Sequence, residues 1–402
     1  MLPSLVRESF LDNLTHSLVG AALAELALPT GAPRATRRTF FIAGIVAANL
    51  PDADLVYTRI TPPPLGALLH HRGHTHTMAG LAVLGLAMAI VWMLPSLRNA
   101  VGPLRRRFWM LLAIALASHL VLDSWNSYGV HPFWPLSSRW YYGDAVFIME
   151  PWLWLLLGTA ATLNSVSRWG HALIGGALAL VVTGAVLVRM VPFAGLAIPA
   201  VCAVVLGVAM RRWTPRRRSA AALALALAFV AGSFVTREVV RAKILASGAR
   251  AVSPQVIDLV LSPRGGNPLC WTVVSVVRDE PAGTYLLTRG DVAVLARSAC
   301  GSARPSDVRW GDTSMHSLAQ LRALYRDDCW VRGWMQFGRA PEVADGAIAD
   351  IRYGNSFRGN FTTMTLLPPA EAARCPANLT SWRPPRADLL GEDVERAGPE
   401  LR

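Results

Sequence analysis

The sequence predicts an all-α polytopic membrane bundle of about seven to eight helices, followed by a small β-rich domain. Three observations predict this fold class. The 402-residue chain is 53% hydrophobic and 16% charged, which is too apolar for an ordinary soluble protein. Long apolar stretches recur over the first 236 residues, most of them near the ~20 residues that a membrane-spanning helix needs. Beyond about Ser253 the chain becomes polar and rich in proline and glycine.

The apolar stretches come in a clear order. They cover residues 40–50, 76–97, 108–122, 145–163, 171–191, 193–210 and 219–236, and "THSLVGAALAELAL" at 15–28 precedes them. The stretches at 15–28 and 40–50 are short for a full crossing, so we expect partial or interfacial helices there. These patterns predict a membrane-embedded helical domain over 1–248, an extracytoplasmic β-rich domain over 249–382 and a disordered tail over 383–402.

Positively charged residues are concentrated in the loops between these apolar stretches. The formal net charge is +13, and Lys243 is the only lysine. Many of the arginines lie in short loops: Arg34, Arg37, Arg38, Arg98, Arg105, Arg106, Arg107, Arg168, Arg211, Arg212, Arg216, Arg217 and Arg218. Cytoplasmic loops are enriched in this way, so the charge indicates membrane topology, and we expect no nucleic-acid partner. The N-terminal segment lacks the basic start and apolar region of a removable signal peptide.

Alternating crossings set the orientation. With every arginine cluster on the cytoplasmic side, the helix at 219–236 carries the remaining residues outward. The sequence therefore predicts a multi-pass protein of a bacterial inner membrane, with its C-terminal domain outside the cytoplasm.

The same alternation gathers histidines and carboxylates at the outer face. "NLTHS" begins the first helix, "LPDAD" ends the second, "HRGHTH" begins the third and "SHLVLD" ends the fourth. Asp144 and Glu150 open the fifth. Ionisable groups at membrane depth are costly and usually functional, so this convergence predicts a functional site rather than unrelated polar side chains.

The spacing of these residues suits metal ligation. His119 and Asp123 are four residues apart, as are Asp12 and His16, so each pair shares one side of a helix. His71 and His76 flank a junction at which Gly73 permits a bend. Imidazole with carboxylate is a ligand set for zinc, manganese or iron. We expect a divalent metal site, zinc first, with one or two ions held by His16, Asp52, His71, His76, His119 and Asp123.

Other histidines receive different roles. His70 and His74 are extra imidazoles that would line the mouth of the site. His131, His171 and His316 match no ligand spacing, and we interpret them as structural or surface residues.

The combined motifs resemble a known family. "DNLTHSLVGAALAE", "LPDADL", "HRGHTH" and "SHLVLDSWNSYGVHPFWPLSSRWYYGDAVFIMEP" are similar to the YdjM-like membrane-bound metal-dependent hydrolases over roughly residues 12–155. The resemblance implies kinship with the zinc-dependent phospholipase C and single-strand nuclease superfamily, whose helical bundles hold metals with histidine and aspartate. The matching positions are His16, Asp52, Asp54, His71, His76, His119 and Asp123. Eleven residues precede Asp12 here, and Glu150 stands where the family often has aspartate.

The chemistry that this implies is metal-assisted hydrolysis. A metal lowers the pKa of bound water, and Asp54 or Glu150 would accept the proton. Arg72 has the planar guanidinium that suits a phosphate. A site at the outer membrane surface favours a phosphoester or other ester of a lipid or lipid-linked substrate. We interpret the aromatic-rich segment after the fourth helix as an interfacial aromatic belt, in preference to a lipid-stacking site. Its residues are Trp125, Trp134, Trp140, Tyr141 and Tyr142.

Two other functions stay open. A membrane lipid phosphatase of the phosphohistidine type shares the pattern of "SHLVLD", but its "PSGH" motif is absent and no lysine is near. A metal transporter or sensor would also use such ligands, although transport sites lie near the midplane of the bilayer.

The C-terminal region predicts short strands at "QVIDLVLSP", "CWTVVSVVRD" and "GTYLLTR". It contains four cysteines, Cys270, Cys300, Cys329 and Cys375, while Cys202 falls in an apolar helix. In an oxidising compartment these could form two disulfides in any of three pairings. We find no catalytic constellation in this region, which could cover the site, select the substrate or bind a partner.

Overall fold

The structure is a computed structural model that describes residues 4–165, 167–187, 191, 193–246, 255–295, 300, 308–354 and 357–391. Eight helices in this part of the chain have 14 residues or more: α1 (Ser4–Ala27), α2 (Arg34–Asn49), α4 (Met78–Val91), α6 (Arg105–Asp123), α7 (Pro151–Asn164), α8 (Arg168–Leu187), α9 (Phe193–Met210) and α10 (Pro215–Ala246). Shorter elements join them: η1 (Leu50–Val56), η2 (Thr58–Ile60), α3 (Leu65–His70), η3 (His74–His76), α5 (Pro95–Val101) and η4 (Gly102–Leu104).

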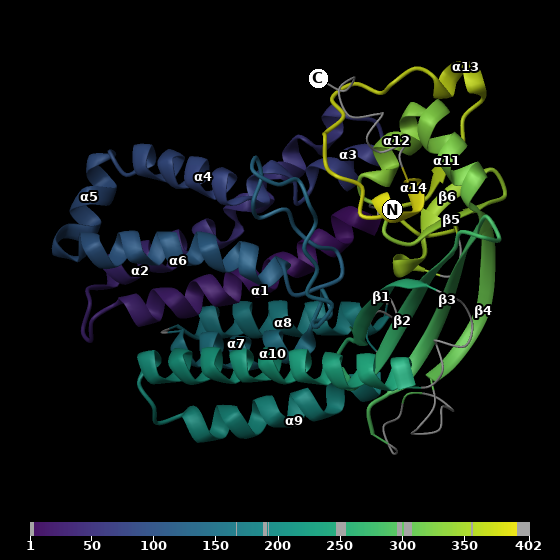
Figure 1. Cartoon of the computed structure of the whole chain (residues 1–402). Coiled ribbons are helices and arrows are strands. Elements are labelled where there is room, and N and C mark those ends of the chain that lie inside the picture. The colour runs from purple at the N-terminus through teal and green to yellow at the C-terminus, as the bar shows by residue number, and fades with distance from the viewer. Residues whose placement is uncertain are drawn as a thin grey trace.

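Helix α1 lies at the centre of the helical part. It contacts α2 and α6 on one side and α7 and α10 on the other, so two groups of helices meet along it (Figure 1). Gly20 of α1 faces Gly44 of α2, and a Cβ on either glycine would meet the backbone oxygen of the other. Such small residues let apolar helices pack backbone to backbone. This close approach fixes the position of η1, which follows α2, relative to α1.

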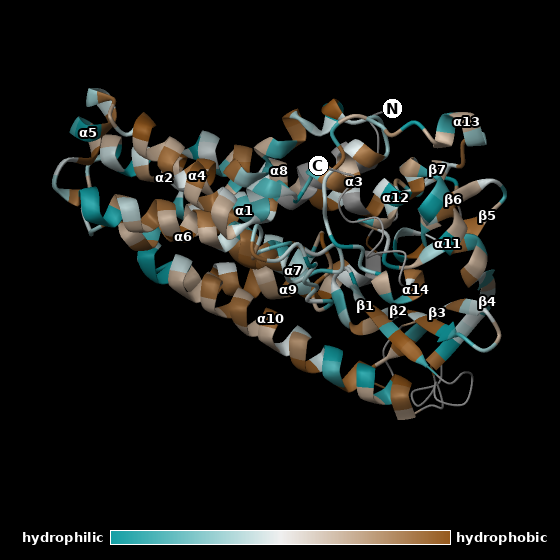
Figure 2. Ribbon diagram, turned by 45° about the horizontal axis from the view of Figure 1, so that its top comes forward, coloured by the Kyte–Doolittle hydropathy of each residue, from teal (hydrophilic) through white to brown (hydrophobic). Residues whose placement is uncertain are grey.

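Two helical segments of the described chain are long and apolar enough to cross a membrane, Arg34–Ile60 and Pro215–Ala246. The pair Leu65–His76 and Met78–Val91 is bent by 68° and gives a third candidate if the pair counts as one span. Helices α4 and α7 have 14 residues each, which is short of the ~20 needed for a crossing. These helices support the prediction of a helical membrane protein, but they do not confirm that the chain crosses the membrane seven to eight times. Figure 2 shows hydrophobic residues along much of α9 and α10.

The loops with the arginine clusters share one end of the bundle. In Figure 1 the α1–α2 loop, α5 and the α9–α10 loop lie at the end opposite the strands. The one-sided distribution expected from the sequence is therefore present in the fold.

The C-terminal region contains two antiparallel sheets and several short helices. β1 (Val256–Arg264), β2 (Asn267–Asp279), β3 (Thr284–Ala293) and β4 (Val308–Ser317) form one sheet in that order. β5 (Pro341–Ala344), β6 (Ala347–Asp350) and β7 (Met364–Thr365) form the other. The remaining elements are α11 (Leu318–Asp327), α12 (Cys329–Met335), η5 (Ile351–Tyr353), α13 (Pro369–Ala372) and α14 (Ala387–Leu390).

The three predicted strands correspond to β1, β2 and β3. Two disulfides are present, Cys270–Cys300 and Cys329–Cys375, and Cys202 is free in α9. Strand β4 was not predicted from the sequence, because six of its ten residues are exposed and no apolar alternation marks it.

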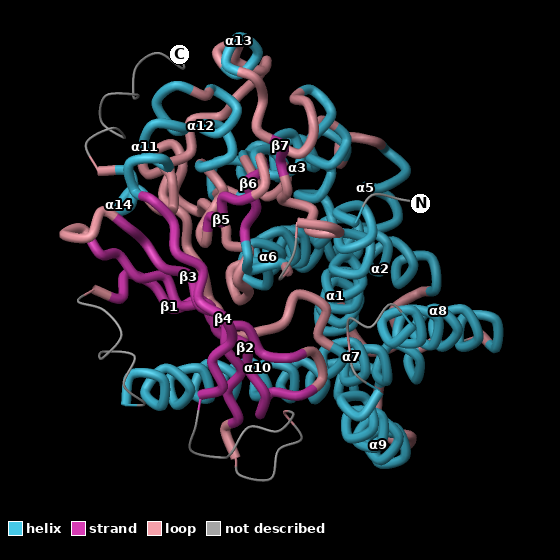
Figure 3. The backbone as a smooth tube through the Cα atoms, turned by 90° about the vertical axis from the view of Figure 1, so that its right-hand side faces the viewer, coloured by secondary structure: helices cyan, strands magenta, loops and turns pink. Residues whose placement is uncertain are grey.

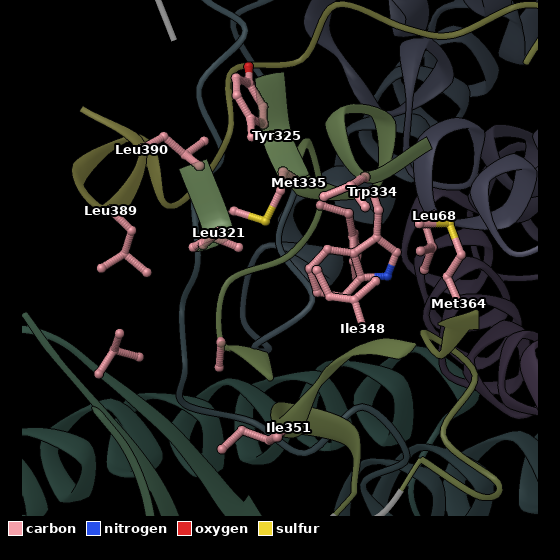
Figure 4. Close-up of a cluster of buried hydrophobic side chains, with 14 of the residues drawn as sticks. Leu68, Leu321, Tyr325, Trp334, Met335, Ile348, Ile351, Met364, Leu389 and Leu390 are labelled. Carbon is pink, nitrogen blue, oxygen red and sulfur yellow. The ribbon is translucent and has the colours of Figure 1, made fainter. Parts of the chain in front are cut away.

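This region shares one hydrophobic core with the end of the helical bundle. Leu65, Leu68 and Leu69 of α3 are fully buried against residues of α11, α12 and the second sheet. Figure 4 shows Leu68 beside Trp334 and Met364. The C-terminal region therefore sits directly on the segment that precedes the predicted ligands of the α3–α4 turn.

The expected disordered tail needs a correction. Leu389 and Leu390 of α14 are fully buried in the shared core, so residues 383–391 pack onto the domain through these leucines. Residues 392–402 lie outside the described part of the chain.

Candidate metal centre

Four segments that are distant in sequence place histidines and aspartates at the end of the bundle that faces the C-terminal region. The residues are His16 of α1, Asp52 and Asp54 of η1, His71, Arg72 and His76 of the α3–α4 turn, and His119 and Asp123 of α6. Figure 3, which views the molecule from the side of the C-terminal region, shows α3 next to strands β6 and β7.

Four of these side chains converge on one point. Asp52, His76, His119 and Asp123 each offer one ligand atom, and these atoms lie within 4.8 Å of one another. His76 Nε2 is 2.9 Å from His119 Nε2, 3.3 Å from Asp52 Oδ1 and 3.1 Å from Asp123 Oδ2. His119 Nε2 is 3.5 Å from Asp52 Oδ1 and 3.3 Å from Asp123 Oδ2. We call these four residues the primary cluster.

The distances within the primary cluster fit a tetrahedral ion. Zinc binds histidine nitrogen and carboxylate oxygen at about 2.0–2.2 Å, and four tetrahedral ligands at that range are about 3.3–3.6 Å apart. The five distances above span 2.9 to 3.5 Å. Two imidazoles and two carboxylates are also a donor set that zinc accepts. The residues present therefore fit a divalent metal.

Outer contacts orient both imidazoles towards this point. His119 Nδ1 lies 2.6 Å from the carbonyl oxygen of Ala48, and because a carbonyl only accepts, Nδ1 carries the proton. His76 Nδ1 lies 3.1 Å from Asp54 Oδ2. Metal-binding histidines commonly hold their second nitrogen in this way. Both Nε2 atoms are thereby directed into the primary cluster.

Charge also favours a cation at this position. Asp52, Asp54 and Asp123 are 8% exposed or less. The guanidinium of Arg72 contacts Asp123, and the backbone N–H of Arg72 donates to Asp54. With neutral imidazoles, three carboxylates and one guanidinium leave two negative charges unbalanced. Buried carboxylates are costly unless they are paired or coordinate a metal, and one divalent cation would balance these charges.

A second group shares a ligand with the first. Asp52, Asp54 and His71 also offer atoms within 4.8 Å of one another. His71 Nδ1 lies 3.1 Å from Asp54 Oδ1. The geometry is therefore compatible with one metal in the primary cluster or with two that share Asp52.

Asp54 already has many hydrogen-bond donors. Its Oδ2 accepts from the backbone N–H of Arg72 at 3.0 Å and from Thr75 Oγ1 at 2.8 Å, in addition to its contacts with His71 and His76. These contacts favour a positioning role for Asp54. Its predicted role as proton acceptor stays a prediction.

Arg72 lies inside the site rather than at its edge. It is 1% exposed, and its guanidinium contacts Asp123 Oδ1 at 2.9 Å and Asn126 Oδ1 at 3.1 Å. Its φ of 57° is unusual for a residue with a side chain. The sequence offered no sign of Asn126, because its role depends on this tertiary contact.

His16 stands beside the primary cluster. Its ring stacks on that of His119 with centroids 3.8 Å apart, and its Nε2 lies 3.4 Å from Asp123 Oδ1. The side chain of Asp12, its predicted partner, lies outside the described residues.

Glu150 is placed away from this group. It caps α7, and its Oε1 accepts from the backbone N–H groups of Trp152 at 3.2 Å and Gly266 at 3.1 Å. Within the described chain it joins neither group of potential ligands. These contacts indicate that Glu150 ties α7 to the β1–β2 turn, and its catalytic role stays a prediction.

The C-terminal region covers the histidines next to the cluster. His70 Nε2 lies 2.8 Å from Thr61 Oγ1, which also contacts the carbonyl oxygens of Ala377 and Asn378. The ring of His74 lies 4.7 Å from that of Trp382. Trp382 was not predictable as a neighbour of this site, because no motif links it to residues 300 positions earlier.

His131 and Trp140 belong to this cover. His131 is fully buried between Trp140 and Trp382, with ring centroids 3.8 and 4.0 Å away. Burial lowers the pKa of His131 to about 3. Trp140 is 5% exposed and donates to the carbonyl oxygen of Gln336, so it packs on the C-terminal region and not on lipid. The predicted structural role of His131 is consistent with this position.

Comparisons with known proteins agree with the motifs. Residues 11–198 match the model of the YdjM inner membrane protein family. The chain is 28% identical over 168 residues to inner membrane protein YbcI of Escherichia coli (strain K12), a match that covers 40% of this chain and 84% of that protein. It is 27% identical over 148 residues to the uncharacterized protein YfhP of Bacillus subtilis (strain 168), covering 36% of this chain and 43% of that protein. No solved structure matches the chain significantly. Over residues 11–198, this chain has the features of a YdjM-family inner membrane protein, as its motifs indicated.

Proposed function

We propose that the protein is a zinc-dependent hydrolase that cleaves a phosphoester or other ester of a membrane lipid at the extracytoplasmic end of its helices. The observation that carries the proposal is the primary cluster, whose five interatomic distances of 2.9 to 3.5 Å are close to the edges of a tetrahedral metal site. The proposal includes the predicted orientation, with seven to eight crossings, the arginine-rich loops in the cytoplasm and the C-terminal region outside.

Each residue of the site would have a distinct role. Asp52, His76, His119 and Asp123 would hold the ion, and Asp54 would orient His76. When bound, a divalent metal acts as a Lewis acid that polarises a phosphoryl or acyl oxygen and eases the deprotonation of water. Arg72 would keep Asp123 ionised and in place through their 2.9 Å contact.

An apolar groove supports a lipid substrate. It has a volume of about 410 Å³ and lies between α2, α4 and α6. Ile42, Val46 and Val91 line it and are about half exposed. Leu50, two residues before Asp52, also lines it. Asp52 is the most exposed carboxylate of the primary cluster, at 8%. An acyl chain in this groove would bring its head group towards Asp52.

The first test is the metal content of detergent-purified protein, measured by inductively coupled plasma mass spectrometry. We expect stoichiometric zinc in the wild type and its loss in H76A/H119A. The matched control is H171A, because the His171 side chain lies on the exposed surface of α8 and contacts only Ser167 among the described hydrogen bonds. Metal retention in H76A/H119A would overturn the assignment of the site.

The second test separates hydrolysis from the alternatives. Lipid phosphodiesters and monoesters in mixed micelles are followed by ³¹P NMR with the metal-loaded protein. Cleavage by the wild type and not by H76A/H119A supports the hydrolase. Metal-loaded protein that cleaves none of these lipids but carries the ion into liposomes would replace the hydrolase with a transporter. A phosphorylated histidine trapped during turnover would indicate the phosphohistidine mechanism instead.

A further inference from the structure

A second groove lies at the opposite, arginine-rich end of the bundle. It has a volume of about 540 Å³ and runs between α1 and α6. Its apolar wall consists of Leu23, Leu26, Ala27, Met110, Leu111 and Ile114. Met110 and Ile114 are one helical turn apart and about half exposed, so the groove opens sideways towards the surroundings of the bundle.

Three guanidinium groups border this groove, from Arg106 and Arg107 of α6 and Arg216 of α10. All three residues are exposed. The described lining contains no carboxylate, and no hydrogen bond or ion pair within the described residues engages these three side chains. Arg218 nearby differs, because it donates to the carbonyl oxygens of Met210, Leu163 and Arg211.

An adjoining hollow of about 480 Å³ shares Arg216 with the groove. It is also lined by Arg217, Arg37 and Glu25. Arg37 is neutralised there by Glu25, with Nη2 and Oε1 2.6 Å apart. Positive charge that is not balanced locally is therefore concentrated on the side of Arg106, Arg107 and Arg216.

We propose that this groove binds one anionic phospholipid of the cytoplasmic leaflet. The phosphate would lie among the three guanidinium groups, whose planar donors suit phosphate oxygens. An acyl chain would follow Leu23, Leu26, Met110 and Ile114. Basic pockets between membrane helices bind anionic head groups in this way. A free anion would contact only the arginines, so the apolar wall beside them favours a lipid as the ligand. Arginine is generally enriched in cytoplasmic loops, but that enrichment would not produce an apolar wall next to the charges.

The test uses the full-length protein in a neutral detergent and measures its thermal midpoint while lipid is titrated. We expect phosphatidylglycerol to raise the midpoint, and phosphatidylcholine, inorganic phosphate and glycerophosphoglycerol to leave it unchanged. In R106Q/R107Q/R216Q the apparent affinity for phosphatidylglycerol should fall about tenfold or more.

A matched variant removes equal charge without touching the groove. Arg105, Arg211 and Arg212 are also exposed on the same end but do not line it, so R105Q/R211Q/R212Q should bind as the wild type does. A third variant, I114W, keeps every arginine and fills the groove, and it should also lose the lipid. Equal losses in the two triple variants, unchanged binding in I114W, or an equal response to inorganic phosphate would each overturn the proposal.

Discussion

The Nε2 atoms of His76 and His119 lie 2.9 Å apart in the interior, although the residues are 43 positions apart in the chain. Ala48 and Asp54 engage the Nδ1 atoms of the two rings. Both rings therefore turn Nε2 towards the same small space. If both imidazoles are neutral at Nε2, each can donate a lone pair to one cation placed between them.

Metal removal should destabilise the protein. A ligand present at 100 times its dissociation constant stabilises the folded state by about 2.7 kcal/mol, so we expect a strong chelator to lower the thermal midpoint and added zinc to restore it. The measurement is differential scanning fluorimetry in detergent. H119A/D123A serves as control and should show no response to either treatment; an equal response would contradict the site.

Asp54→Asn should weaken metal binding without removing a ligand of the primary cluster. Loss of an outer contact to a metal-binding histidine typically costs about 10- to 100-fold in affinity, and Asp54 contacts both His71 and His76. Competition with a zinc-sensitive dye gives the affinity. Asp327→Asn changes an exposed carboxylate and should have no effect, whereas wild-type affinity in Asp54→Asn would show that Asp54 does not orient the site.

The buried His131 should make stability depend on pH. Because its pKa is about 3 in the folded protein and about 6.5 when unfolded, the unfolded chain takes up a proton first as the pH falls. Stability is then present above about pH 6.5 and lost at about 1.4 kcal/mol per unit below it, until about pH 3. His131→Phe keeps a ring between Trp140 and Trp382 and lacks this dependence. Thermal midpoints at pH 5 and 7.5 should therefore differ less in the variant; equal differences would contradict the assignment.

Arg339→Met should destabilise the protein strongly. Its guanidinium bridges Asp144 at 2.8 Å and Asp258 at 2.7 Å, and Arg339 is 5% exposed. Removing one partner of a buried ion pair costs about 3–5 kcal/mol, because the other charge stays buried. Arg326→Met, which breaks an exposed pair with Asp327, should cost at most about 1 kcal/mol. Chemical unfolding curves compare the two variants.

Gly20→Ala should loosen the packing of α1 on α2. The new methyl group would meet the backbone oxygen of Gly44, and overpacking of this kind costs about 1–3 kcal/mol. Gly175→Ala on α8 is the control, because nothing lies within 4 Å of its added Cβ. A Gly20→Ala variant as stable as Gly175→Ala would show that the helices can separate without penalty.

Local periodicity made much of the candidate site predictable. His119 and Asp123 are four residues apart on one helix, and antiparallel neighbours bring helix ends together, so the convergence follows from the order of apolar stretches. The strands β1, β2 and β3 follow from alternation in the same way. These features depend on residues close in sequence.

Contacts between distant segments were not predictable. Arg72 was expected to meet a substrate, but its position depends on a backbone φ of 57° and on Asp123 and Asn126, about 50 residues away. Glu150 was expected near the metal, but its partner is Gly266, 116 residues later. The number of crossings is not confirmed, because hydropathy does not show where a helix stops, and α7 ends after 14 residues.

The cover over the site has a consequence for how the protein matures. Trp382 donates to the carbonyl oxygen of Leu69, 313 residues earlier, and packs on His74. The ribosome therefore finishes every ligand of the primary cluster long before it makes the residues that close over them. During this interval the cluster in the nascent chain is still uncovered, and we expect an ion to enter then, before Trp382 and its neighbours pack over the adjacent His74.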